Sequence, residues 1–265
     1  MAAVEDTMSA KVLILTGYGI NAEKELAWAF DKAGGQTNIK HLEDVIDNPS
    51  ILDDHQILAF PGGFSYGDHI ASGKVFGNKI KFTIFEKVQK FIDSGKLIIG
   101  ICNGFQIITK LGLVPNCDGR YEQVASLIEN DSAHFEDRWV WLQNTNPNSI
   151  WLKDIDKIYL PIRHGEGKFI VKNDEVLNTL KANGQIALRY IDINNPTAQN
   201  VPYPANPNGS VDNIAGITNK SGTVFGLMPH PEAFIFPENH PNWTEGVHNT
   251  PLGLKIFENG VNYFK

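Results

Sequence analysis

The stretch Lys96-Leu-Ile-Ile-Gly100-Ile-Cys102-Asn103-Gly104-Phe-Gln106 decides the fold of this chain. Its first half is a short apolar run of the kind that forms a buried parallel strand, and residues 105–111 have helical spacing. Cys102 is therefore predicted on a strand-to-helix turn, between two glycines. This is the cysteine version of the G-x-S-x-G nucleophile elbow, in which missing side chains let the chain bend sharply.

The predicted turn also suits a reactive sulfur. Unpaired N–H groups at the start of a helix carry partial positive charge, so they favour a thiolate and can receive a developing oxyanion. Cys102 is thus a candidate nucleophile.

Apolar strands alternate with amphipathic helices through the first two-thirds of the chain. The pattern predicts strands at residues 11–16 and 57–60 and helices at residues 22–33 and 74–94. Such alternation is typical of a parallel sheet with helices on both faces, which gathers ligands at the carboxyl ends of its strands. After about residue 121 strands dominate, and we expect them to add an antiparallel portion to the same layered domain. These later strands are predicted at residues 139–142, 157–161, 186–190, 214–218 and 224–228.

A second reactive stretch, Pro229-His230-Pro-Glu232, follows the last of these strands. Proline fixes φ and keeps the preceding residue extended, so the two side chains point the same way. His230 can then take the thiol proton while Glu232 accepts a hydrogen bond from the other ring nitrogen. A His-Pro-Glu by itself is more often a turn with a surface histidine, but beside a cysteine elbow it favours a catalytic triad.

The stretch Pro61-Gly62-Gly63 follows another predicted strand, where a Gly-Gly is usually only a turn. Next to an elbow it also lets the backbone approach a substrate, so that a glycine N–H can pair with the N–H of Asn103 as an oxyanion hole. Gly67 and Gly73-Lys74 resemble a phosphate-binding loop only loosely, because five residues separate the glycines and Val75 replaces the magnesium-binding Ser or Thr. We expect no nucleoside triphosphate site in this chain.

Composition narrows the class of protein. With 265 residues and 42% hydrophobic content the chain can bury a full core, and we predict one domain over residues 11–265 after a flexible extension at residues 1–10. The 30 acidic and 23 basic residues argue against nucleic acid or an anionic membrane as a partner. No apolar run approaches the ~20 residues that span a bilayer, and no basic segment opens a signal peptide, so we expect a cytoplasmic protein. Of the two cysteines, Cys117 is interpreted as an incidental thiol, and no metal-binding cluster is expected.

The elbow and the His-Pro-Glu stretch resemble those of the class I (triad) glutamine amidotransferases, in which such a cysteine attacks the side-chain amide of glutamine. From about residue 11 to the end, the chain is similar to the family of glutaminase subunits of phosphoribosylformylglycinamidine synthase, an enzyme of de novo purine synthesis. The stretches that carry this similarity are Pro61-Gly-Gly-Phe-Ser-Tyr-Gly-Asp68, Arg138-Trp-Val140, His164-Gly-Glu-Gly-Lys-Phe169, Asn206-Pro-Asn-Gly-Ser210, Ile214-Ala-Gly-Ile217 and Gly226-Leu-Met-Pro-His-Pro-Glu232.

The resemblance implies an α/β fold, flavodoxin-like and doubly wound, with a mostly parallel sheet, helices on both faces and an added antiparallel portion. It also implies the site residues. These are the catalytic Cys102, His230 and Glu232, the oxyanion-hole residues Gly62, Gly63 and Asn103, and the glutamine-binding residues Gln106, His164, Gly165, Glu166 and Gly167. The alternatives are an exposed polar helix position for Gln106 and an ordinary loop histidine for His164.

The implied reaction is hydrolysis of glutamine through a cysteinyl thioester to glutamate and ammonia. A partner synthetase would use the ammonia with ATP to convert formylglycinamide ribonucleotide to formylglycinamidine ribonucleotide. No cofactor is expected in this chain, ATP and magnesium would bind the synthetase, and the need for a small bridging subunit stays open.

Two other classes of protein remain as alternatives. One is a stand-alone elbow-cysteine hydrolase or deglycase of a related superfamily, which generally lacks a His-Pro-Glu stretch. The other is a non-catalytic scaffold subunit, against which the intact Cys, His and Glu set counts. The chain also departs from the family in an insertion at residues 233–251, which we expect either near the glutamine pocket or partner, or as a surface loop.

Overall fold

A computed structural model of the chain describes residues 9–146, 149–246 and 250–265. Residues 1–8 of the predicted N-terminal extension lie outside the described residues. Ala10 is buried, and its carbonyl oxygen accepts a hydrogen bond from the N–H of Gln36. The packed fold therefore includes the last residue of the segment that was predicted to be an extension.

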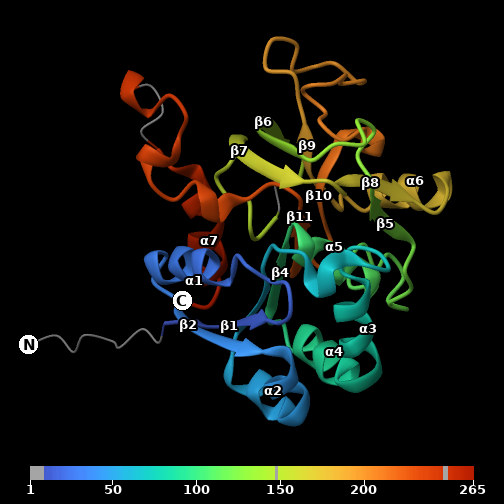
Figure 1. Ribbon diagram of the computed structural model, residues 1–265, viewed down its shortest axis with the longest axis vertical. Helices are drawn as coiled ribbons and strands as arrows, with labels where there is room; N and C mark the ends of the chain where they lie inside the picture. Colours follow the sequence, from blue (N-terminus) through green and yellow to red (C-terminus); the bar gives the residue numbers. More distant parts are fainter. Residues whose placement is uncertain (1–8, 147–148, 247–249) are drawn as a thin grey trace, which may run out of the picture.

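Within the described residues, nine strands form one mixed sheet in the order β2-β1-β3-β4-β11-β10-β9-β6-β7 (Figure 1). The parallel strands are β2 (Gln36–His41), β1 (Lys11–Thr16), β3 (Ile57–Phe60), β4 (Leu97–Ile101) and β11 (Val224–Leu227). The antiparallel extension consists of β10 (Ile214–Thr218), β9 (Ile186–Tyr190), β6 (Glu136–Asn144) and β7 (Lys157–His164). The predicted fold class is confirmed.

Helices cover both faces of this sheet. Figure 1 shows α1 (Glu23–Lys32) and α7 (Leu252–Asn262) together on one side, and α3 (Lys74–Thr83), α4 (Phe85–Asp93) and α5 (Asn103–Lys110) on the other. Helix α2 (Leu42–Asp47) contacts β2, and α6 (Asp174–Ala182) contacts β8 (Lys168–Val171), which pairs with β5 (Ala125–Ile128) in a separate two-stranded sheet. Short 3-10 turns are η1 (Pro49–Asp54), η2 (Ser65–Asp68), η3 (Val211–Asn213), η4 (Pro231–Ala233), η5 (Pro237–Asn239) and η6 (Trp243–Glu245). No helix in the described part of the chain is long and apolar enough to cross a bilayer.

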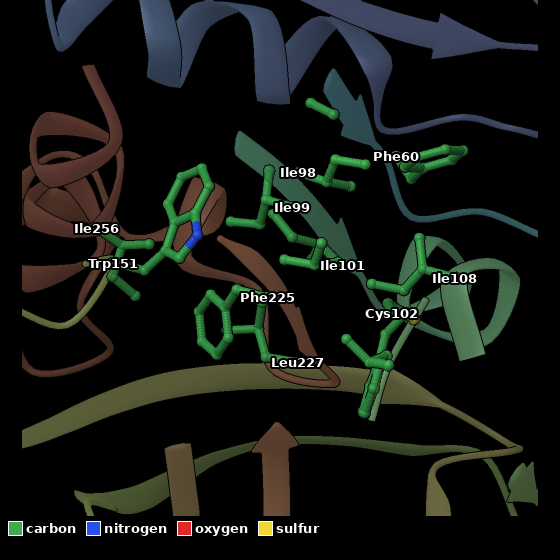
Figure 2. Close-up of a cluster of buried hydrophobic side chains, with 14 of the residues drawn as sticks. Phe60, Ile98, Ile99, Ile101, Cys102, Ile108, Trp151, Phe225, Leu227 and Ile256 are labelled. Carbon is green, nitrogen blue, oxygen red and sulfur yellow. The ribbon is translucent and has the colours of Figure 1, made fainter. Parts of the chain in front are cut away.

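The core lies around the central strands β4 and β11. Figure 2 shows Ile98, Ile99 and Ile101 of β4 beside Phe225 and Leu227 of β11, and all five side chains are fully buried. A strand covered on both faces reads as a continuous apolar run, which is why β4 lacks the alternation of a half-exposed strand. The loops at the carboxyl ends of β4 and β11 therefore start from rigid, densely packed positions.

The prediction of one continuous helix over residues 74–94 is wrong, because the structure has two helices there. The structure divides it at Ile84 (φ −121°, ψ 14°), which ends α3 and begins α4. The hydroxyl of Thr83 donates to the carbonyl oxygen of Lys79 at 2.5 Å, and such side-chain bonds to the preceding turn bend helices. The divided helix still covers the predicted face of the sheet.

Candidate active site

The nucleophile elbow joins β4 to α5. Cys102 is the N-cap of α5, with φ 53° and ψ −108°, a backbone conformation that is costly for a residue with a side chain. A Cβ atom on Gly104 would lie 1.9 Å from the carbonyl oxygen of Phe60, and one on Gly100 would lie 2.6 Å from the carbonyl oxygen of Gly104. The glycines therefore allow α5 to approach β3 and β4 closely, whereas the sharp bend falls on Cys102 itself.

Three neighbouring parallel strands end at this edge of the sheet. Strand β3 leads into Gly62, β4 into Cys102, and β11 into the segment that contains His230. A Cβ atom on Gly62 would lie 3.0 Å from Cε1 of His230 and 3.6 Å from Cβ of Cys102. The imidazole and the nucleophile thus flank the same glycine, although their positions in the sequence are far apart.

His230 and Glu232 form a buried pair. Nδ1 of His230 lies 2.6 Å from Oε1 of Glu232, and each residue is only 6% exposed. The backbone N–H of His230 donates to the carbonyl oxygen of Pro161 at 2.8 Å, which fixes the segment against β7. The other ring nitrogen, Nε2, has no nitrogen or oxygen partner in the described residues, and a side-chain hydrogen bond with Cys102 is one of the causes that raise the pKa of the ring, so Nε2 is the nitrogen available to the sulfur.

The charges of the triad are coupled. Burial alone would lower the pKa of His230, but the Glu232 carboxylate and the Cys102 sulfur outweigh burial and raise the pKa above its ordinary value of 6.5. A protonated imidazole beside a sulfur favours the thiolate, which is the nucleophilic form. The sulfur lies 3.6 Å from the carbonyl oxygen of Arg163, which can accept the thiol proton's hydrogen bond only while the sulfur is protonated. The raised pKa keeps the His230 ring protonated beside the sulfur, so it can act as a proton donor there.

Two backbone donors point to an oxyanion hole. Gly63 adopts φ 150°, and Asn103 is the first residue of α5. Across residues 9–146, 149–246 and 250–265, neither of their N–H groups donates to a protein acceptor. Gly63 lies in the β3 loop and Asn103 next to the nucleophile, so the two predicted donors come from adjacent strand ends.

Gln106 lies one helical turn after the nucleophile and is only 4% exposed, so the alternative of an exposed helix position is wrong. Its Nε2 donates to the carbonyl oxygen of Glu166 at 2.7 Å, and its Oε1 accepts from Nδ2 of Asn103 at 2.7 Å. This places the loop of residues 164–167 beside the elbow helix. The N–H groups of Gly165 and Glu166 donate to no protein acceptor within the described part of the chain.

The side chain of His164 is buried at 2% exposure and turned toward two asparagines. Its Nδ1 lies 3.1 Å from Oδ1 of Asn130, and its Nε2 lies 3.5 Å from Nδ2 of Asn208. Burial, assisted by the charge of His230, lowers the pKa of His164 to about 3. The ring is therefore neutral, with a proton on Nδ1 for Asn130 and a lone pair on Nε2 for Asn208.

Several residues that hold this loop had no predicted role. Oδ1 of Asn130 accepts from the N–H of Gly167 at 2.9 Å, and Oγ of Ser210 accepts from the N–H of Phe169 at 2.9 Å. Asn208 also donates to the hydroxyl of Tyr190 at 3.1 Å. Asn208 and Ser210 belong to a stretch that carried the family resemblance, whereas Asn130 follows a short strand and had no signal in the sequence.

The insertion at residues 233–251 begins beside the triad acid. Rings of its Phe234 and His240 lie 5.3 and 5.4 Å from the ring of Trp139 on β6. A cavity of about 390 Å³ lies between the insertion and α1, and it is lined by Lys24, Glu25, Trp28, Arg163, Glu232, Ala233, Ile235, Phe236 and Asn239. Residues 247–249 of the insertion lie outside the described residues. The described part therefore packs against β6 and lines a cavity beside Glu232.

Cys117 lies away from this site. It lines a separate surface cavity with Gly95, which precedes β4, so it belongs to the opposite edge of the sheet from Cys102. Both cysteines are free thiols. Among the described residues, no group of three or more His, Cys, Asp or Glu side chains is arranged to hold a metal ion.

Comparison with known proteins points to one family. Residues 9–264 match the model of the CobB/CobQ-like glutamine amidotransferase domain. A protein of Methanococcus maripaludis described as phosphoribosylformylglycinamidine synthase subunit PurQ is 43% identical over 270 residues, which covers 96% of this chain and 97% of the relative. A protein of Dehalococcoides mccartyi with the same description is 44% identical over 258 residues, with the same coverage.

A solved structure described as PurLQS from Thermotoga maritima agrees with these relatives. It matches 97% of this chain and 100% of its own chain, with a TM-score of 0.73 and 31% identity. Because the family model and the relatives span nearly the whole chain, the chain belongs to the PurQ family of glutamine amidotransferases.

Proposed function

We propose that this chain is the glutaminase subunit of a phosphoribosylformylglycinamidine synthase and hydrolyses glutamine through a thioester on Cys102. The observation that supports this proposal most directly is that Cys102 and His230 flank Gly62 at one edge of the sheet, with Glu232 bonded to the far side of the imidazole. A nucleophile, a proton carrier and an orienting carboxylate are the groups that acyl transfer requires.

In the first half-reaction the Cys102 thiolate attacks the side-chain carbonyl carbon of glutamine. A C–S bond forms, and the carbonyl oxygen becomes an oxyanion that the N–H groups of Gly63 and Asn103 stabilise, with Gly62 leaving room for it. Loss of one such donor costs about 2.7 to 4 kcal/mol in comparable enzymes. The His230 imidazolium then gives its proton to the amide nitrogen, the C–N bond breaks, and ammonia leaves.

In the second half-reaction His230 is neutral and acts as a base. It removes a proton from water, which attacks the thioester carbon, and the same oxyanion hole holds the new tetrahedral intermediate. The C–S bond breaks, glutamate leaves, and the thiolate and imidazolium are restored. Glu232 keeps the ring in one orientation throughout and stays ionised.

The backbone of residues 164–167 is our candidate for the site that holds the amino-acid end of glutamine. The N–H groups of Gly165 and Glu166 are the donors that a carboxylate would need, since neither is used elsewhere in the described structure. Gln106 supports this loop through Glu166 and remains a candidate contact for the substrate. His164 would contribute by holding the loop in place, because its ring and its carbonyl oxygen are both bonded to Asn130.

The partner we propose is a separate ATP-dependent synthetase that uses the ammonia to convert formylglycinamide ribonucleotide to formylglycinamidine ribonucleotide. The matched relatives are described as subunits of that synthase, and the matched structure as PurLQS. ATP and magnesium belong with the synthetase in this scheme, and a bridging subunit is an open part of it. Free ammonia is mostly protonated at neutral pH and would be lost to solution, so its release should be coupled to the partner. We therefore expect weak glutaminase activity from the chain alone and stimulation in the complex.

The test uses the reconstituted complex and two variants. Cys102→Ala should abolish synthesis with glutamine and leave synthesis with ammonium intact, whereas Cys117→Ala should leave both intact, because Cys117 lies away from the site. Glutamine-dependent synthesis by Cys102→Ala would refute the thioester mechanism. Full glutaminase turnover by the isolated chain would instead favour a stand-alone hydrolase.

A further inference from the structure

The mechanism above uses only the backbone N–H of Asn103, yet its side chain is the most connected polar group beside the nucleophile. Asn103 is fully buried. Its Oδ1 accepts from the N–H of Ser65 at 3.2 Å, and its Nδ2 donates to Oε1 of Gln106 at 2.7 Å and to Oδ1 of Asp68 at 3.4 Å. One carboxamide thus makes three hydrogen bonds next to the reacting sulfur.

These partners belong to different loops. Ser65 and Asp68 lie in the loop after β3, which also carries Gly63. Gln106 passes the connection on, because its Nε2 donates to the carbonyl oxygen of Glu166 in the loop after β7. A continuous chain of hydrogen bonds therefore joins the loop of the oxyanion glycine, the elbow helix and the candidate glutamine-binding loop.

The β3 loop needs such a restraint. Tyr66, Gly67 and Asp68 all have positive φ values of 55°, 68° and 53°, so local preference does not hold the loop in this shape. Its other backbone bonds, from Phe64 to Gly19 and from Tyr66 to Tyr18, tie it to the loop after β1. Among the described contacts of Asn103, the bond from the N–H of Ser65 and the bond to the carboxylate of Asp68 tie the β3 loop to the elbow.

This restraint matters for the chemistry because the two oxyanion donors lie on the two joined segments. The N–H of Gly63 moves with the β3 loop, and the N–H of Asn103 moves with the elbow. Catalytic hydrogen bonds work only when their donors are held within about 0.5 Å of the productive geometry. A connection between the two segments is therefore a connection between the two donors.

We propose that the Asn103 carboxamide is a positioning residue that sets the spacing of the oxyanion donors and, through Gln106, the position of the glutamine-binding loop. The inference rests on the proposed function, because it concerns the same reaction. It assigns the side chain a role in transition-state stabilisation that is separate from the nucleophile and from the His230–Glu232 pair.

The test compares Asn103→Leu, which has a similar size and no hydrogen bonds, with Thr109→Val in the same helix. Thr109 is equally buried, but its hydroxyl bonds only to the carbonyl oxygen of Phe105. In the reconstituted complex, kcat with glutamine should fall about 100-fold or more for Asn103→Leu, as when an oxyanion donor is lost, and stay within about threefold for Thr109→Val. The rate of Cys102 alkylation by iodoacetamide and synthesis with ammonium should stay near wild type in both.

A conservative variant separates positioning from simple destabilisation. Asn103→Asp keeps the shape of the side chain and the acceptor for the Ser65 N–H, but it loses both bonds that Nδ2 donates and sets a carboxylate beside Asp68, so its kcat should fall at least as far as that of Asn103→Leu. Thermal unfolding checks each variant, and Asn103→Ala takes the place of Asn103→Leu if the latter does not fold. An Asn103 variant with wild-type kcat, or a loss of kcat matched by an equal loss of alkylation rate, would overturn the inference. A different result, turnover of glutamine by Cys102→Ala, would refute the proposed function itself.

Discussion

Acid titration should reveal the cost of keeping His164 neutral in the folded chain. Burial lowers the pKa of His164 to about 3, whereas the ordinary value of 6.5 applies to the unfolded chain. Below about pH 6.5 the unfolded state therefore binds a proton that the folded state cannot bind, and the free energy of unfolding falls as the pH falls. The window runs from about 6.5 down to the folded pKa of about 3.

The size of the effect follows from the pKa difference. At about pH 5.5, one unit below the unfolded pKa, the single site costs about 1 kcal/mol, and at neutral pH it costs almost nothing. His230 acts with the opposite sign, since its raised pKa gives stability that is fully present below the unfolded pKa and is lost as the pH rises through the folded pKa. The two histidines partly cancel in the wild type, so only a comparison with a His164 variant isolates the buried neutral ring.

The assay is chemical unfolding of the wild type, His164→Gln and His134→Gln at about pH 7.5 and about pH 5.5. His134 is exposed, so its ring gains no burial cost on folding. The destabilisation caused by His164→Gln should be about 1 kcal/mol smaller at the lower pH, because the wild type alone suffers the titration penalty. His134→Gln, at an exposed position, is the control for the loss of a histidine. A His164→Gln penalty that stays constant, or grows, at low pH would refute a neutral buried ring.

Substitutions at the triad acid and the elbow glycine test the charge and the packing of the site. Glu232→Gln keeps the shape but removes the charge that supports the His230 imidazolium, so glutamine turnover should fall about 10⁴-fold. Near-wild-type turnover by this variant would contradict the role of the carboxylate. Gly104→Ala places a Cβ 1.9 Å from the carbonyl oxygen of Phe60, so chemical unfolding should show a loss of about 1 to 3 kcal/mol. Gly77→Ala, in α3 with only ordinary contacts, should instead gain about 0.5 to 1 kcal/mol, and equal effects of the two alanines would refute the packing argument.

The central strands of the sheet could be predicted from the sequence because they are buried on both faces. The continuous apolar run of β4 ends next to Cys102, and the ends of the apolar runs of β3 and β11 place Gly62 and His230 in the same way. Since the carboxyl ends of parallel strands share one edge of a sheet, residues distant in the sequence could be assigned to one site. The pairing of β4 with β11 could not be predicted from the sequence, because four strands of the antiparallel portion lie between them along the chain.

The sequence did not predict those features that depend on contacts between distant parts of the chain. Helical spacing left the exposure of Gln106 open, and burial comes from the loop at Glu166, which folds over the helix from another strand end. The edge strand β2 was not predicted, because its residues Gln36–His41 are mostly polar and lack an apolar period. The break at Ile84 was not predicted either, because no proline or glycine marks it in the sequence.

The asparagines around His164 have a physical explanation in the charge of the neighbouring triad. The proposed reaction needs one positive group, the imidazolium of His230, at the sulfur, and a second imidazolium nearby would oppose its protonation. Asn130 and Asn208 satisfy both nitrogens of His164 without carrying charge, so they hold the ring in place and leave it neutral. Glu232 does the reverse for His230, because a carboxylate stabilises the protonated ring. Uncharged partners for one histidine and an acid for the other thus direct the single proton to the imidazole that faces the substrate.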